Sequence, residues 1–399
     1  NGRFAVSQMS DSLRMASASF CSGSGGNASR ATPDSVYVDG LRAPVIAATK
    51  FTLPDNTTAF GSTSGDNTYP AEPTSANYPL PSFFYMRGYD CAKDGTCTPV
   101  DPHDTVASIP ASGTSVGKRV IGSDVLTIRY LDGSQGWAIS DNDTVNVTDS
   151  AVSSIVIVPE TGEPTAADLS TGDLMMYGDC SSTTVFNATF STGAPLTVTV
   201  GDTGTAAGDN LGTFAANLDP DAPTKLYDFS KAFQTITWYL QVVDDGSGDG
   251  HVTGALMRRV NGGAAEEIVR GIERLDFKYG VLDDTGATRY LSAEDIDNGD
   301  SGAVKCPLQP PHAPDVAGFQ TGCLWRAVQT VEVSMLVDGQ QSMPTLEDSA
   351  LAYSYSPDSL APKPPDDASH VIKFSDQGFQ RGVLRREFNA LVAVRNFNP

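Results

Sequence analysis

Residues 274–281 read Arg-Leu-Asp-Phe-Lys-Tyr-Gly-Val, a stretch in which large apolar side chains alternate with polar residues. Alternation with a period of two places the apolar side chains on one face of an extended chain, so the stretch predicts a half-buried β-strand. Residues 331–337, Val-Glu-Val-Ser-Met-Leu-Val, follow the same pattern. Each predicted strand needs a covering layer on its apolar face, which makes an antiparallel β region the basis of the fold.

Further runs rich in β-branched and aromatic residues predict strands around this pair. They lie at 36–38, 45–51, 83–86, 124–130, 154–158, 174–177, 196–200, 236–242 and 388–395. Residues 22–118 are rich in Pro, Ser, Thr and Gly. We therefore expect mostly ordered loop with a few short strands in that segment.

The first 20 residues predict an amphipathic helix. At 100° per residue, six apolar side chains fall on one stripe. They are Ala5, Val6, Met9, Leu13, Ala16 and Phe20. Phe4 and Met15 lie on a flank that a lone surface helix usually keeps polar. They indicate either ordinary partial exposure or a helix with partners on two sides. The predicted class is α+β, with this helix packed on a large antiparallel β region.

The composition excludes some classes of protein. The chain has 399 residues and a net charge of −22, and 40% of its residues are hydrophobic. Its length and apolar content are enough for a substantial core, whereas nucleic-acid binding would need clustered Lys and Arg. No apolar run approaches the roughly 18 residues of a membrane span. Because the chain opens at Asn1 and not at Met, we expect an upstream segment to have been removed.

Six cysteines form an even set with no Cys-x-x-Cys and no His at zinc-finger spacing. Such a set predicts three disulfides and an oxidising compartment. We expect Cys91 to pair with Cys97 across a short turn and Cys306 with Cys323 around a longer loop. Cys21 and Cys180 then pair by elimination, although six cysteines allow 15 arrangements in principle.

No motif of catalysis or of metal binding stands out, so we expect no enzymatic activity, no cofactor and no metal. Three of the four histidines sit beside turn residues; the four are His103, His251, His312 and His370. Acidic groups of residues at 141–143, 244–249 and 295–300 are rich in oxygen ligands and could hold Ca²⁺. None of them has the EF-hand spacing, so solvated turns are the expected structure.

Several separated stretches resemble one family. They are 1–5, 11–16, 122–130, 172–180, 256–259, 266–280, 325–328 and 385–396, and the most specific of them reads Glu-Glu-Ile-Val-Arg-Gly-Ile-Glu-Arg-Leu-Asp-Phe-Lys-Tyr-Gly over 266–280. Together they resemble the PilW-type minor pilins of the bacterial type IV pilus. Cys21 also stands where many members place a Cys just after their N-terminal helix. Residues 30–118 match nothing in this family.

The resemblance implies a pilin-like fold in three parts: residues 1–21 as the outer half of the N-terminal helix, 22–118 as an insertion, and 119–399 as the β-rich head. It also implies a leader and an apolar half-helix upstream of Asn1, by which the protein would be held in the inner membrane. The head would be periplasmic before assembly and extracellular afterwards, with long loops pinned by disulfides.

The function implied is that of a minor pilin, which joins other minor pilins to prime pilus assembly and stays at the filament tip. Its expected partners are those minor pilins, the major pilin and a large PilY-type tip adhesin. The residues expected at the assembly interface are Phe4, Met9, Leu13 and Met15.

Two alternatives remain open. A J-type minor pseudopilin of type II secretion has a similar plan, but its members are usually shorter. A secreted carbohydrate-binding or adhesive β domain would place aromatic side chains in a sugar site, although core packing is the commoner use of such residues. The candidates for that site are Tyr89, Trp137, Trp238 and Trp325.

Overall fold

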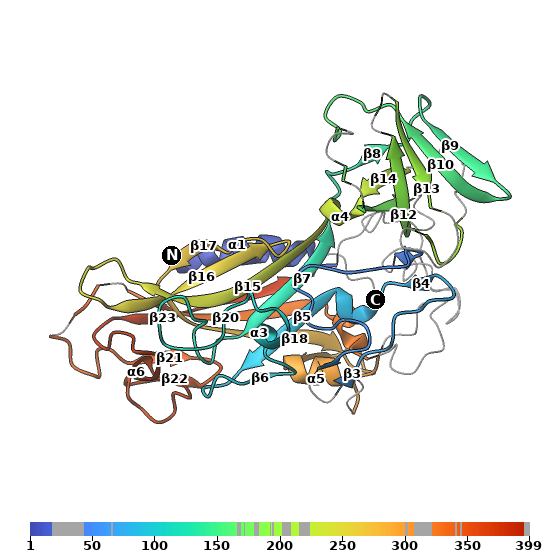
Figure 1. Ribbon diagram of the computed structural model, residues 1–399. Coiled ribbons are helices and arrows are strands. Elements are labelled where there is room, and N and C mark those ends of the chain that lie inside the picture. The colour runs from blue at the N-terminus through green and yellow to red at the C-terminus, as the bar shows by residue number, and fades with distance from the viewer. Residues whose placement is uncertain are drawn as a thin grey trace.

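A computed structural model shows a mostly β protein in which two lobes meet (Figure 1). The structure describes residues 1–17, 44–64, 67–165, 169–170, 172–178, 183–191, 193, 195–201, 209–214, 224–299, 302–306, 321–339, 341–343 and 345–394. The larger lobe contains the N-terminal helix α1 (Gly2–Met15) and two sheets.

The first sheet of the larger lobe has six strands in the order β17-β16-β15-β7-β5-β6. Their bounds are Glu266–Arg270, Val252–Val260, Phe233–Asp244, Val125–Leu131, Met86–Cys91 and Cys97–Thr98. All of these pairings are antiparallel. β5 lies before residue 118 and β7 after it, so the described residues on both sides of the expected domain boundary share one sheet.

The second sheet has four strands in the order β19-β18-β20-β23. Their bounds are Thr288–Leu291, Ile272–Leu282, Thr330–Asp338 and Arg385–Ala393. The two alternating stretches of the sequence form neighbouring strands, with Phe277 opposite Val333. Their apolar faces point into one core, as the period of two predicts.

The main core lies where the two sheets and α1 meet. It includes Trp238 from the six-stranded sheet and Phe277 and Met335 from the four-stranded sheet. α1 lies against β23 and β20 of one sheet and against β17 and β7 of the other. The helix ends before Ser17, which adopts a positive φ of 61° and donates its backbone N–H to Arg129 O at 2.8 Å.

The second lobe is a nine-stranded sheet in which the path β8-β14-β11-β12-β13-β10-β9 is extended by β1 and β4. Their bounds, in that order, are Trp137–Ala138, Lys225–Asp228, Leu174–Gly178, Thr183–Ser191, Leu196–Val200, Ala151–Ile157, Thr144–Thr148, Val45–Ile46 and Tyr78–Pro79. Both of its faces carry apolar clusters, because alternate residues such as Met175 and Met176 point to opposite sides.

Short elements complete the described chain. They are β2 (Thr63–Ser64), β3 (Asn67–Thr68), η1 (Ser82–Phe84), α3 (Pro102–Thr105), α4 (Phe229–Ala232), α5 (Ala293–Asn298), η3 (Cys323–Ala327), β21 (Tyr353–Tyr355), β22 (Ser359–Lys363) and α6 (Phe374–Gln377). Disulfides join Cys91 to Cys97 and Cys306 to Cys323, two of the three pairs expected from the sequence. Cys21 and Cys180 lie outside the described residues.

Candidate functional site

One face of α1 is buried in the main core. Ala5, Met9 and Leu13 are almost completely inaccessible and belong to the same apolar cluster as β20 and β23. Gly2 permits this close approach, because a Cβ at that position would lie 2.6 Å from Cδ2 of Phe388. Met9 and Leu13, which the sequence suggested as assembly contacts, therefore face this protein's own sheet and are not available to a neighbour.

The opposite face of α1 carries large apolar side chains in solvent. Phe4 is 52% exposed and Met15 is 39% exposed. Eleven residues at 100° each bring Met15 back to within about 20° of Phe4, so the two lie on one line along the helix. Gln8 and Asp11 fall between them on that line, and Arg14 pairs with Asp11 at 3.4 Å. We call Phe4, Gln8, Asp11 and Met15 the outer stripe of α1.

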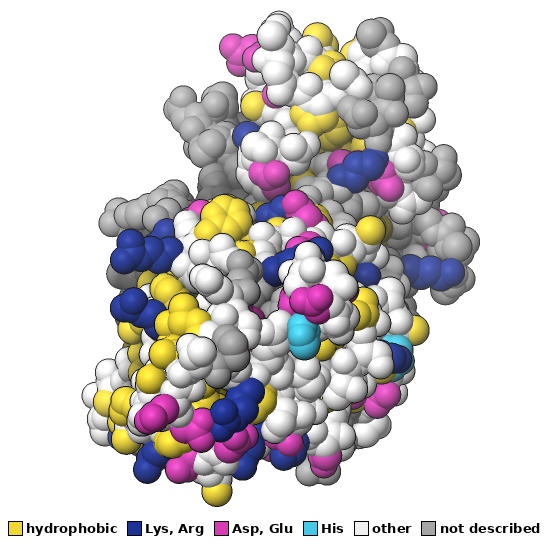
Figure 2. Space-filling model, turned by 90° about the vertical axis from the view of Figure 1, so that its left-hand side faces the viewer, with side chains coloured by type: hydrophobic (Ala, Val, Ile, Leu, Met, Phe, Trp, Pro, Cys, Tyr) yellow, Lys and Arg dark blue, Asp and Glu magenta, His cyan; other side chains and the backbone are white. Residues whose placement is uncertain are grey.

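A groove of about 610 Å³ adjoins the start of α1. It is lined by Asn1, Gly2, Val337, Asp338, Gly339, Leu384, Arg385, Arg386 and Phe388. Leu384 at its wall is 43% exposed. The surface on the N-terminal side of the molecule shows hydrophobic side chains gathered beside Lys and Arg (Figure 2).

Arg385, which contributes to the lining of this groove, forms a buried ion pair. Arg385 Nε donates to Glu273 Oε2 at 2.6 Å, and both side chains are nearly inaccessible. Burial raises the pKa of Glu273, and the neighbouring Arg385 guanidinium opposes that effect. Arg385 also donates to the carbonyl oxygens of Arg381 and Val383. The pair therefore joins β18 to β23 and holds the loop that leads into β23.

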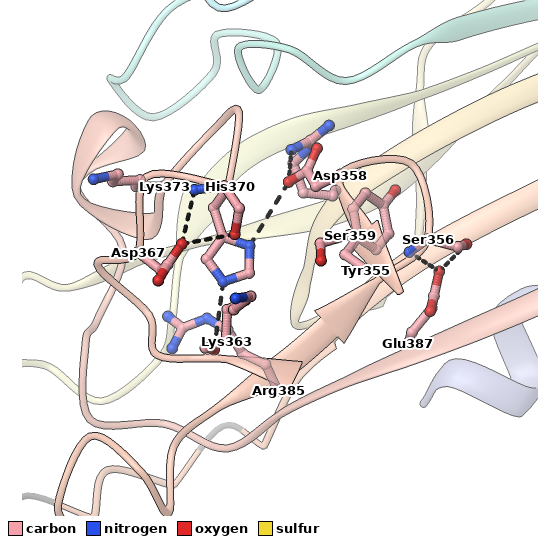
Figure 3. Close-up of polar contacts among 12 residues, drawn as sticks. Tyr355, Ser356, Asp358, Ser359, Lys363, Asp367, His370, Lys373, Arg385 and Glu387 are labelled. Atoms are coloured by element: carbon pink, nitrogen blue, oxygen red, sulfur yellow. Dashed lines mark hydrogen bonds and ion pairs between the residues drawn. The ribbon is translucent and has the colours of Figure 1, made fainter. Parts of the chain in front are cut away.

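The other face of β23 is covered by the segment from β21 to α6 (Figure 3). Ser356 N donates to Glu387 Oε1 at 2.7 Å, and the Ser356 hydroxyl contacts the same carboxylate. Nearby, the His370 ring stacks on Tyr353 with centroids 4.2 Å apart, and its Nδ1 lies 3.8 Å from the Asp358 carboxylate. These contacts hold β23 on the face opposite α1.

A cavity of about 620 Å³ lies between the two sheets and the β21–β22 turn. Four carboxylates and one Lys are among the residues that line it: Asp90, Asp124, Asp276, Glu332 and Lys278. Burial raises the pKa of Asp90 to about 6 and raises that of Asp124, which accepts the backbone N–H groups of Cys91 and Phe277. The described residues that line the cavity include no histidine and no free cysteine thiol.

The other candidate residues are dispersed. Tyr89, Trp137, Trp238 and Trp325 are all buried, so none of them lines an exposed sugar site. Within the described ranges no cluster of three or more His, Cys, Asp and Glu could hold a metal ion. His312 and Asp300 lie outside those ranges.

Asp297 corrects the expectation of a solvated turn at 295–300. Its side chain is inaccessible and pairs with the buried Arg87 guanidinium. Tyr69 Oη and Trp325 Nε1 also donate to its carboxylate, at 3.0 Å and 3.1 Å. Four segments of the chain therefore meet at one carboxylate, a role that the local sequence around Asp297 does not indicate.

The comparisons with known proteins concern the part of the chain that includes β20 and β23, against which α1 packs. Residues 238–396 match the family model PilW, described as Type IV Pilus-assembly protein W. This range runs from β15 to the end of β23 and includes the whole four-stranded sheet, whereas residues 137–228 of the second lobe lie outside it. No curated protein and no solved structure matches the chain. Residues 238–396 are therefore similar to a family whose described role is in type IV pilus assembly.

Proposed function

We propose that this protein is a minor pilin that joins other minor pilins to prime type IV pilus assembly. It then stays at the filament tip, where it supports a large tip adhesin. The family match supports the role in assembly. The observation that carries the finer proposal is the division of α1 into a face buried in the main core and an outer stripe with exposed Phe4 and Met15.

The proposed mechanism is association. Residues on the buried face keep α1 attached to its own head, so the outer stripe can be presented to a neighbouring subunit without unfolding. Burying one large apolar side chain contributes roughly 1.5–3 kcal/mol before the costs of association are subtracted. Phe4 and Met15 are about 16 Å apart along the helix, which is enough to contact another helix over three turns.

Within the described residues, no helix is long and apolar enough to cross a membrane. The proposal includes a membrane anchor in the apolar half-helix that the resemblance to minor pilins implies. Before assembly the head would face the periplasm, and after assembly it would be extracellular. The two disulfides in the described chain support an oxidising location of this kind.

The test uses point variants of the full-length gene, because removing α1 would expose the core. Phe4→Asp with Met15→Asp introduces charge on the outer stripe while leaving the buried face intact. In the host lacking its own copy, this double variant is expected to abolish surface pili and to lose co-purification with the other minor pilins. Leu360 and Val371 are 84% and 62% exposed, so Leu360→Asp with Val371→Asp is a matched control.

Normal piliation by the double α1 variant at wild-type protein level would contradict the assembly role of the outer stripe. The tip location is tested separately, by gold labelling of an epitope placed in the β15–β16 loop near Gly248. Label at one end of each filament is expected. Label along the whole filament would contradict a tip position but not a role in assembly.

A further inference from the structure

Strand β9 ends the sheet of the second lobe. It pairs with β10 on one side, and among the described residues no strand pairs with its other side. The β9–β10 hairpin forms the outer margin of that lobe (Figure 1). An edge strand presents a row of unpaired backbone N–H and C=O groups, which is a template for another extended chain.

The turn of the hairpin determines which backbone groups are free. Asp149 and Ser150 both have positive φ, 51° and 66°, as in a two-residue type I′ turn. Thr148 and Ala151 flank this turn and face each other across it. Because bonding alternates along an antiparallel strand, Val147 and Val145 direct their N–H and C=O groups away from β10. Neither has a backbone hydrogen-bond partner on that side within the described chain.

The composition of β9 distinguishes it from the other edges. Proteins usually protect a long edge strand with charge, Pro or a covering segment. In the described part of the chain, the other edge strands of four or more residues all carry charge: β17 has Glu266 and Arg270, β19 has Arg289, β22 has Lys363, and β23 begins with two Arg. β9 reads Thr-Val-Asn-Val-Thr, with no charge and no Pro. Val147 on its outer half is 40% exposed.

Two carboxylates, Asp143 and Asp149, flank this uncharged strand and favour some partners over others. In the antiparallel register that uses both free residues, Val145 of one chain faces Val147 of the other. That register places Asp143 opposite Asp149 at both ends of a self-paired strand. Like charges directly opposite each other are destabilising, so the flanks disfavour a second copy and favour a strand with cationic ends.

We propose that β9 is a docking edge for an extended segment of a partner protein, which adds to the second lobe as an antiparallel strand. The segment has the pattern basic-x-apolar-x-apolar-x-basic. Its apolar residues lie opposite Val147 and Val145 and extend the apolar face on which Val145 already packs. Its basic residues lie near Asp149 and near Asp143, whose carboxylate also accepts the backbone N–H groups of Ser140 and Val158 at 2.7 Å. Residues between them face the Thr and Asn side chains of β9, so they are polar.

The experiment titrates the whole chain with a capped peptide, Lys-Thr-Val-Thr-Val-Thr-Lys, and measures binding by fluorescence anisotropy. A peptide with Glu at both ends is expected to bind about tenfold more weakly, because two cross-strand charge pairs change sign. N-methylation of either Val of the peptide removes an N–H that faces β9 and is expected to abolish binding. N-methylation of the central Thr, whose N–H points away, is the matched control and should leave binding unchanged.

Two protein variants complete the test. Val147→Pro removes one outward N–H at an edge position where Pro is compatible with folding, and it should abolish binding. Asp149→Asn keeps the positive φ, which Asn tolerates, and should weaken the Lys peptide about threefold, whereas Asp249→Asn in the β15–β16 loop should not. The proposal would be overturned by equal binding of the Lys and Glu peptides, by equal effects of the N-methyl groups, or by no binding at millimolar peptide. It would also be overturned by dimerisation of the chain alone that Val147→Pro abolishes, since that result would identify a second copy as the occupant.

Discussion

Leu13→Ala should destabilise the larger lobe strongly. Leu13 is fully inaccessible and packs in the cluster that includes Trp238 and Trp325. Deleting its three outer carbons removes their transfer free energy and leaves a cavity that a two-sheet core fills only in part. Substitutions of this kind cost about 3–5 kcal/mol. Urea unfolding followed by Trp fluorescence reports the change, because Trp238 and Trp325 lie in the same cluster.

Phe4→Ala on the same helix is the matched control. It removes a larger side chain, but one that is 52% exposed. Exposed substitutions change the free energy of unfolding by about 0.5 kcal/mol or less, and the higher helix propensity of Ala offsets part of that. Similar losses of stability for the two variants, or a neutral Leu13→Ala, would refute the division of α1 into a buried face and an outer stripe.

Three further predictions concern polar groups and disulfides of the larger lobe. Burial raises the pKa of Asp90 from 3.8 to about 6. At a pH between these two values, Asp90 is therefore mostly protonated in the folded protein and mostly ionised in the unfolded chain. Its contribution to stability should therefore increase by about 1 kcal/mol as pH falls from 7 to 5, and Asp90→Asn should remove that increment from urea midpoints measured at both pH values. Arg87→Met leaves the inaccessible Asp297 carboxylate without its cation and should lower the free energy of unfolding by about 3–5 kcal/mol. Adding Asp297→Asn in the same chain should restore part of that loss. An unchanged urea midpoint for Arg87→Met would contradict the pairing. Replacing Cys306 and Cys323 by Ser opens a loop with a sequence separation of 17 and should cost about 3 kcal/mol in thermal unfolding, whereas a melting temperature equal to wild type would show that the bridge constrains nothing.

The elements of the main core could be predicted because burial of one face leaves a local pattern. The alternation at 274–281 and 331–337 is confirmed as β18 and β20, and the expected stripe of Ala5, Met9 and Leu13 is buried. A helical pattern ranks side chains by hydrophobicity but does not say which partner covers them. That is why Met9 and Leu13 were expected at an assembly interface and are found against this protein's own sheet.

Pairings between distant residues leave no such pattern. β5 comes from a segment expected to be mostly loop, yet it lies between β7 and β6 in the six-stranded sheet. Phe83 was expected in a strand and lies in η1, while Met86 begins β5. The acidic run at 295–300 indicated a turn by its composition. Its buried pairing with Arg87 depends on a contact across most of the chain, which only the folded structure reveals.

The position of α1 on β23 has a consequence for the order of synthesis. The helix is among the first described segments to be made, and β23, the strand it lies against most closely, is the last. While the intervening chain is being made, the apolar face of α1 lacks part of the surface against which it packs. That face can therefore bind chaperones or associate prematurely with other chains. The larger lobe can therefore complete its folding only after β23 has been made.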